Sequence, residues 1–113
     1  MEIKKQSTRP VPVCVDEWND EVKAFLKLDG LDVFTFQQRA NAYWTSDDPA
    51  TKFDAAFEAA VVGLKDADGK PILTLDDRET IRAASYVPLV RVLTVYANEI
   101  GRQPEPPETL KKS

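Results

Sequence analysis

Histidine is absent from this chain of 113 residues, and cysteine occurs once, as Cys14. Without histidine the chain lacks the commonest general base, and it can form neither a Ser-His or Cys-His catalytic pair nor a His-containing zinc site. One cysteine cannot form an internal disulfide, which is consistent with a reducing cytoplasm. No basic residue lies close to Cys14 in the sequence, so we expect a small buried residue rather than a reactive thiol. We therefore predict a protein that is not an enzyme and that uses no metal or cofactor.

Long apolar runs and clusters of basic residues are also missing. No segment reaches the length needed to span a membrane, and the polar N-terminus resembles neither a signal peptide nor an anchor. The net charge is −4, and the 15 Lys and Arg residues are scattered except near the two ends. Phosphate binding requires clustered cations, so we expect neither nucleic acid nor a membrane as a partner.

The length and composition predict one globular domain over residues 10–101. A polar, flexible stretch (1–9) precedes it, and a flexible, Pro-rich tail (102–113) follows it. The fold class is α+β and mainly α: a small N-terminal β-hairpin, about four helices and a disordered C-terminal tail.

The hairpin is predicted from two alternating segments. Val11, Val13 and Val15 alternate with other residues, and Pro12 has no N–H for a sheet, so this strand should lie at an edge. In the second strand, apolar residues alternate with mostly polar ones from residue 22 to residue 28, and Phe25 falls on the polar face.

Two helices follow. The first is predicted from Asp32, its expected N-cap, to about Trp44. The second runs over residues 50–64, because Asp48 can cap it and Pro49 suits its first position. It carries the clearest apolar stripe of the chain: Phe53, Ala56, Phe57, Ala60, Val61 and Leu64.

A polar turn over residues 66–71 precedes a third helix. Gly69 can adopt positive φ in this turn, and the segment from Thr74 to Asp77 resembles a capping box. In the helix that follows, Ile81, Ala84 and Leu75 are expected to face inward.

The last helix is apolar around most of its circumference. Either Ser85 caps it and Pro88 lies in its first turn, or a longer helix is kinked at Pro88. A helix apolar on nearly all sides should be buried on nearly all sides. It could lie at the centre of the domain or be shared between subunits, through Val87, Val90, Leu93, Tyr96 and Ile100.

Acidic pairs offer no convincing site. Asp66, Asp68 and Gly69 only superficially resemble a calcium loop, because the glycine comes too early, Lys70 occupies a ligand position, and no bidentate Glu follows at the required spacing. The acidic residues at 47–48 and 76–79 precede or begin helices, where they stabilise the helix start.

Four aromatic residues are the candidates for contact with a partner: Trp18, Phe25, Tyr43 and Trp44. Packing into the core is the simpler interpretation, but Trp and Tyr are also enriched at binding hot spots. Trp18 lies in a polar turn and is therefore the first choice.

The order of these segments resembles the tail assembly chaperones of long-tailed (siphovirus-type) phages and prophages. The resemblance rests on Glu17-Trp18, the alternating strand at 21–28, the helix at 55–64, the turn at 66–71 and the acidic residues of 75–77. The last apolar helix completes the pattern, which covers residues 11–101.

The resemblance implies an assembly factor of the bacterial host cytoplasm that is absent from the mature virion. It would bind and solubilise the tape measure protein and oligomerise into a ring or spiral, with a frameshift-extended form and the tail tube protein as further partners. Two alternatives remain: a structural virion component, such as a tail connector or terminator, and an acidic phage-encoded inhibitor.

Overall fold

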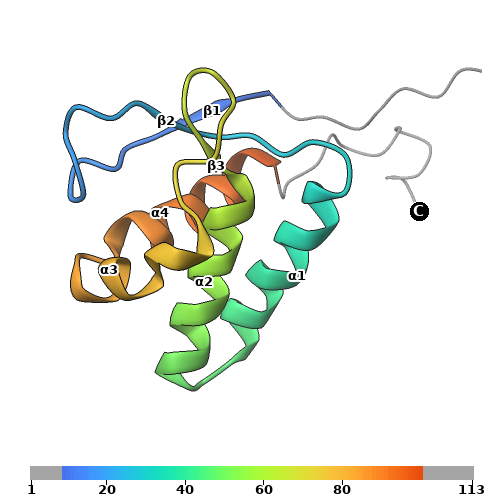
Figure 1. The fold of residues 1–113 in the computed structure, drawn as a ribbon. Coiled ribbons are helices and arrows are strands. Elements are labelled where there is room, and N and C mark those ends of the chain that lie inside the picture. The colour runs from blue at the N-terminus through green and yellow to red at the C-terminus, as the bar shows by residue number, and fades with distance from the viewer. Residues whose placement is uncertain (1–8, 101–113) are drawn as a thin grey trace, which may run out of the picture.

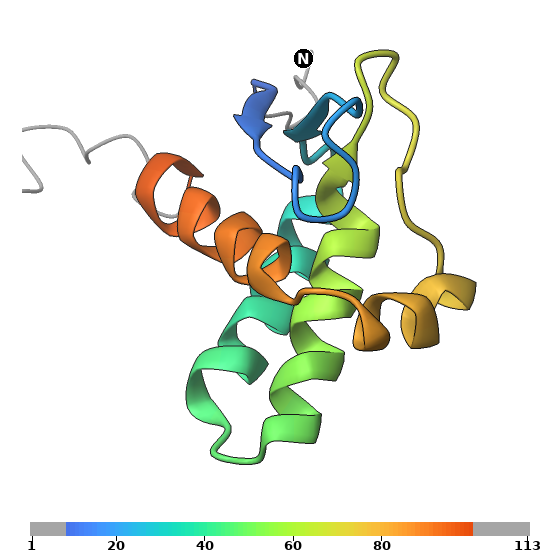
Figure 2. The same cartoon turned by 90° about the vertical axis from the view of Figure 1, so that its left-hand side faces the viewer.

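A helical hairpin, α1 (Asp32–Thr45) and α2 (Pro49–Gly63), forms the centre of the computed structural model, which describes residues 9–100 (Figure 1). A small sheet covers one end of this hairpin, and α4 crosses α2 (Figure 2). The remaining elements are β1 (Val11–Val13), β2 (Ala24–Leu26), β3 (Leu64–Lys65), the 3-10 turn η1 (Leu75–Asp77), α3 (Arg78–Ala83), α4 (Val87–Val95) and the π-helical turn η2 (Tyr96–Ile100). The predicted α+β, mainly helical class is confirmed.

The sheet is antiparallel, in the order β1-β2-β3. The predicted hairpin is confirmed, with Val13 opposite Ala24, and β1 lies at the edge as Pro12 requires. The sequence did not predict β3. The helix expected to reach Leu64 ends at Gly63, and the chain turns to extended conformation at Leu64 (φ −89°, ψ 116°), where it pairs with β2.

The alternation of the hairpin determines which side chains reach the core. Val13 and Val15 are buried, and so are Ala24, Leu26 and Leu28 on the second segment. Cys14 lies between two inward-facing valines, so its side chain points to the opposite face and is exposed. The prediction of a buried Cys14 is therefore wrong.

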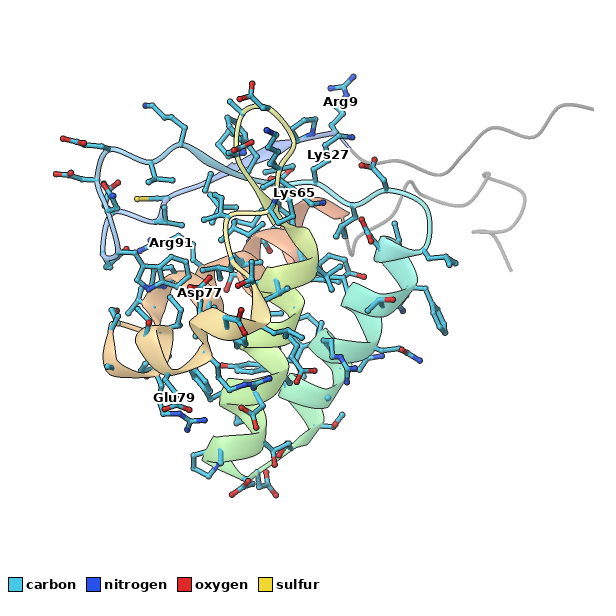
Figure 3. All side chains as sticks on the ribbon, viewed as in Figure 1. Arg9, Lys27, Lys65, Asp77, Glu79 and Arg91 are labelled. Carbon is cyan, nitrogen blue, oxygen red and sulfur yellow. The ribbon has the colours of Figure 1, made fainter. Side chains whose placement is uncertain are left out.

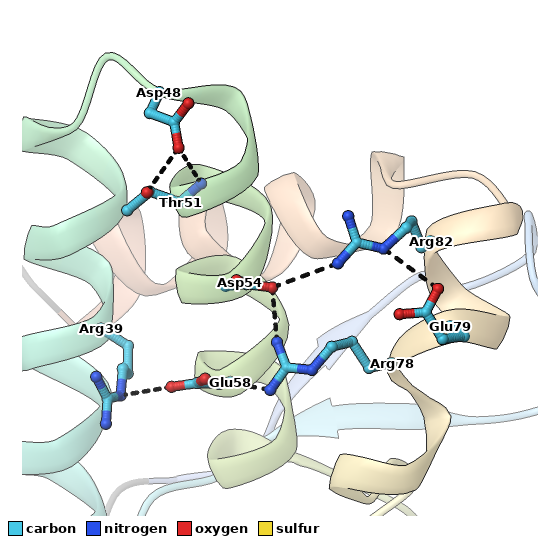
Figure 4. Close-up of polar contacts among 8 residues, drawn as sticks. All are labelled: Arg39, Asp48, Thr51, Asp54, Glu58, Arg78, Glu79 and Arg82. Atoms are coloured by element: carbon cyan, nitrogen blue, oxygen red, sulfur yellow. Dashed lines mark hydrogen bonds and ion pairs between the residues drawn. The ribbon is translucent and has the colours of Figure 1, made fainter.

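The starts of the two central helices differ. Asp48 caps α2, accepting hydrogen bonds from Thr51 N (3.0 Å) and Thr51 Oγ1 (2.8 Å), as predicted (Figure 4). These bonds lower the pKa of Asp48. Asp32 is not the cap of α1, because the N-cap is Leu31 and Asp32 is the first helical residue. Its carboxylate accepts a long bond (3.4 Å) from Asp29 N instead.

The connection from β3 to α3 follows the sequence prediction closely. Asp66 Oδ1 accepts from the amides of Asp68 (2.8 Å) and Lys70 (2.9 Å), and Gly69 has φ +85°. The capping box between Thr74 and Asp77 is present.

The inward face predicted for the third helix is only partly correct. Ile81 is buried, but Leu75 is 59% exposed and Ala84 is exposed. The α-helix begins at Arg78 and ends at Ala83, so Leu75 and Ala84 both lie outside it.

Ion pairs hold α3 against α2 (Figure 4). Arg78 Nη1 lies 2.7 Å from Asp54 Oδ1, and Arg78 Nη2 lies 3.2 Å from Glu58 Oε2. Glu58 also pairs with Arg39 of α1 (3.1 Å), so one set of charges connects three helices. The Arg78 guanidinium lies 5.0 Å from the centre of the Phe57 ring, which adds a cation–π contact.

The last helix begins after Tyr86, with Pro88 in its first turn, so it is a separate helix rather than a kinked long one. Pro88, Leu89, Val92 and Leu93 are buried, and η2 continues the packing, with the Tyr96 ring 4.7 Å from that of Phe36. The sequence predicted a helix buried on nearly all sides. In the single chain it is not, because Val87 is 42% exposed and Val90 and Val95 are half-buried. In the single chain, the core on α2 covers one side of this helix.

Predictions for the two ends lie largely outside the described residues. The flexible segment 1–9 is outside apart from Arg9, and the tail 102–113 is outside entirely. The limits of the 10–101 domain therefore stay a prediction.

Candidate functional site

An apolar groove of about 430 Å³ lies where the end of α1, the start of α2, the end of α3 and the start of α4 meet. Ten residues line it: Tyr43, Pro49, Lys52, Phe53, Ala56, Arg82, Ala84, Tyr86, Leu89 and Val90. Its volume lies within the range of about 300–1,000 Å³ typical of ligand pockets. This apolar groove therefore has the size expected of a binding site.

Short connections on either side create the groove. Asp48 and Pro49 start α2 soon after α1 ends, which leaves Tyr43 and Phe53 at the turn of the helical hairpin. On the other side, the chain passes from α3 to α4 through Ser85 and Tyr86. Tyr86 precedes the first helical residue of α4 and is 64% exposed, so its ring stands at the edge of the groove.

The charged side chains of the groove are both cationic. Lys52 Nζ donates to the carbonyl oxygen of Tyr43 (2.7 Å) and lies 4.2 Å from the centre of the Tyr43 ring. Arg82 lies 4.7 Å from the centre of the Phe53 ring. None of the ten lining residues is acidic. The groove is therefore apolar with two cations on its walls, in a chain whose net charge is −4.

The Glu17-Trp18 pair holds the loop between β1 and β2 against α4 and the segment before it. Trp18 Nε1 donates to the carbonyl oxygen of Ser85 (2.7 Å). Arg91 of α4, labelled in Figure 3, donates two hydrogen bonds to Glu17, at 2.8 and 2.9 Å. The Arg91 guanidinium lowers the pKa of Glu17 to about 2. These contacts fix the segment that carries Tyr86, and so help to shape the groove.

The structure brings only one of the four partner-contact candidates to the groove. Tyr43 is half-buried in its wall. Trp18 packs half-buried beside the core, and Phe25 lies half-buried on the outer face of β2. Trp44 is 47% exposed and lies beside Tyr96 in a separate hollow. Contact of each with a partner stays a prediction.

The self-association candidates divide in the same way. Val90 lines the groove, whereas Val87 is exposed at the start of α4 and is not one of the lining residues. Leu93 and Tyr96 are 1% and 5% exposed, so both belong to the core of this chain rather than to an accessible surface. The side chain of Ile100 lies outside the described residues. Self-association through any of these residues stays a prediction.

Sequence reasoning missed most of the groove. Phe53 was expected only as part of a core stripe, and Lys52, Arg82 and Tyr86 were not singled out. No pattern in the sequence indicated that these residues lie together.

The described residues offer no alternative site with evident chemistry. No group of three or more metal-ligating side chains occurs among residues 9–100. Within the same range, no helix is both long and apolar enough to cross a membrane.

Comparison with known proteins gives a similarity of fold. No protein-family model and no curated protein sequence matches the chain. Among solved structures, the tail assembly chaperone of bacteriophage HK97 matches with a TM-score of 0.50 and 20% sequence identity. The match covers 88% of this chain and 86% of that chain. The fold of this protein is therefore similar, over nearly its whole length, to that of a phage tail assembly chaperone.

Proposed function

We propose that this protein is a tail assembly chaperone of a long-tailed phage or prophage, which binds the tape measure protein and keeps it soluble before the tail is built. It acts without catalysis, in the cytoplasm of the bacterial host, and leaves before the virion is complete. The observation that carries the proposal is the shared fold, which extends over 88% of this chain and 86% of the HK97 chaperone.

The surface of the chain is consistent with this role. A tape measure protein is largely helical, and the apolar stripes of its helices would aggregate if they were left uncovered. Besides the groove, this chain exposes several large apolar side chains: Leu31, Phe34, Trp44, Leu75, Tyr86 and Val87. Apolar contact area of this kind is what a protein needs to cover such a stripe.

Several copies would be needed to cover a long partner. Each copy is small, with principal extents of 49 × 35 × 23 Å, whereas a helix lengthens by about 1.5 Å per residue. We therefore propose a ring or spiral of subunits. A frameshift-extended form and the tail tube protein belong to the same proposal, as further partners.

Co-expression with the tape measure protein of the same genome tests the function. We expect the tape measure protein to become soluble and to elute with several copies of this chain, with the stoichiometry given by light scattering. If the tape measure protein stays insoluble while this chain elutes alone, the proposal fails. Detection of this chain in purified virions would instead support a structural tail component.

A further inference from the structure

The apolar groove carries a charge pattern that points to one kind of occupant. We propose that it binds an amphipathic helix of the partner whose apolar stripe is flanked by Asp or Glu. The inference rests on the proposed function, because it specifies the chemistry of the segment that the chaperone would recognise.

Charge complementarity is the first argument. Both charged residues of the groove are cations, although the chain as a whole has 19 acidic and 15 basic side chains. Arg82 has only long ion pairs, 3.7 Å to Asp54 and 3.5 Å to Glu79. Within residues 9–100, Lys52 forms no ion pair, and its bonds are to a carbonyl oxygen and a tyrosine ring. A carboxylate on a partner would give Lys52 an anionic contact and Arg82 a closer one.

The shape of the apolar surface is the second argument. Leu89, Val90 and Phe53 form an apolar wall with the exposed Tyr86 at its edge, and the exposed Val87, which directly follows Tyr86, adds further apolar surface at the start of α4. A compact small molecule would leave that further surface uncovered. A helix with apolar residues at i, i+3, i+4 and i+7 would place one side chain or two in the groove and lay the others on the further surface.

Two designed helical peptides of equal length test the charge pattern. Both carry the same leucine stripe, flanked by Glu in one and by Lys in the other, and binding to the full chain is followed by fluorescence anisotropy. We expect the Glu peptide to bind about ten-fold more tightly at low salt, because two cations attract it and repel the Lys peptide. Equal affinities of the two peptides, or no binding of either, would overturn the inference.

A charge-reversal variant adds a result that a merely structural lysine would not give. Lys52→Glu should weaken binding of the Glu peptide and strengthen binding of the Lys peptide. Lys52→Met keeps the apolar stem of the side chain and should weaken binding of the Glu peptide only. This variant also provides a test if Lys52→Glu does not fold. If a folded Lys52→Met variant binds neither peptide, the charge of Lys52 does not determine which helix occupies the groove.

A variant that fills the groove distinguishes failure of this inference from failure of the proposed chaperone function. Ala84 and Ala83 are neighbouring exposed alanines at the end of α3, but only Ala84 lines the groove. Ala84→Trp should abolish binding of the Glu peptide, whereas Ala83→Trp should leave it unchanged. If Ala84→Trp still forms the soluble complex with the tape measure protein, the chaperone function stands and the groove is not its binding site. If Ala84→Trp removes only self-association, the groove is an interface between copies and the inference is wrong.

Discussion

Replacement of Gly63 by alanine is expected to destabilise the protein, although alanine is the better helix former. Gly63 is the last residue of α2, at the point where the helix passes beneath the sheet. A Cβ built there would lie 2.8 Å from Leu26 Cδ1, 2.9 Å from Leu28 Cδ2 and 3.0 Å from Phe36 Cδ2. All three neighbours are fully buried, so none can turn out into solvent.

Two opposing effects determine the sign of the change. Alanine gains about 0.5–1 kcal/mol over glycine within a helix, and less at a helix end. An extra methyl group forced into a packed core costs about 1–3 kcal/mol. We therefore expect Gly63→Ala to lower the free energy of unfolding by about 1–2 kcal/mol, measured by urea denaturation with circular dichroism.

A second substitution identifies the clash as the cause. Leu26→Val removes the Cδ atoms of the closest neighbour, so the cost of Gly63→Ala should fall by about 0.5–1 kcal/mol in that background. Additive effects would show that Leu26 is not the obstacle. A Gly63→Ala single variant as stable as the parent would refute the reasoning, because the core would then have adjusted without cost.

Three further changes test contacts that support the fold around the groove. Trp18→Phe should cost about 1–2 kcal/mol in urea denaturation, because the part-buried carbonyl that accepts from the indole loses its partner; an unchanged midpoint would contradict this. Glu17 has its pKa lowered to about 2 by Arg91, so its ion pair stabilises the fold above the ordinary pKa of 4.5 and is lost as the pH falls from 4.5 toward 2. Glu17→Gln should therefore flatten the dependence of melting temperature on pH in that window, and an unchanged slope would count against the pair. Asp48→Ala should cost about 1 kcal/mol at neutral pH through loss of the α2 cap, while the exposed neighbour Asp47, changed in the same way, should have little effect.

Local signals in the sequence predicted much of the fold. The cap at Asp48, the glycine turn at Gly69 and the capping box at Thr74 each depend on residues within a few positions, and each is confirmed. Where such signals were ambiguous, the prediction failed. Asp32 resembled a cap because it precedes an apolar stripe, but the helix begins one residue earlier than that interpretation requires.

Features set by distant contacts could not be predicted in the same way. The strand β3 exists because residues 64–65 meet β2, some 40 positions earlier in the chain, and no local pattern indicates that pairing. The prediction for Cys14 failed for another reason. Its small size suggested burial, but the alternation of side chains along the strand places it on the exposed face. The groove is the clearest case, since it forms where the helical hairpin of α1 and α2 meets the connection from α3 to α4, and no local pattern indicates that these two parts of the chain meet.

The apolar excess of the last helix links the fold to the proposed function. A domain of this size can bury one side of α4 against α2, and Leu89, Val92 and Leu93 occupy that side. The sequence nevertheless places valines at positions 87 and 90, where a single chain leaves them partly exposed. Solubility alone would favour polar residues there, because exposed apolar surface promotes association. Val90 lines the groove, Val87 directly follows the lining residue Tyr86, and the segment before them is held by the hydrogen bond from Trp18 to Ser85. A fixed apolar surface beside two cations is better suited to capturing another chain than to packing within this one, as expected of a protein that covers the apolar stripes of a partner during assembly.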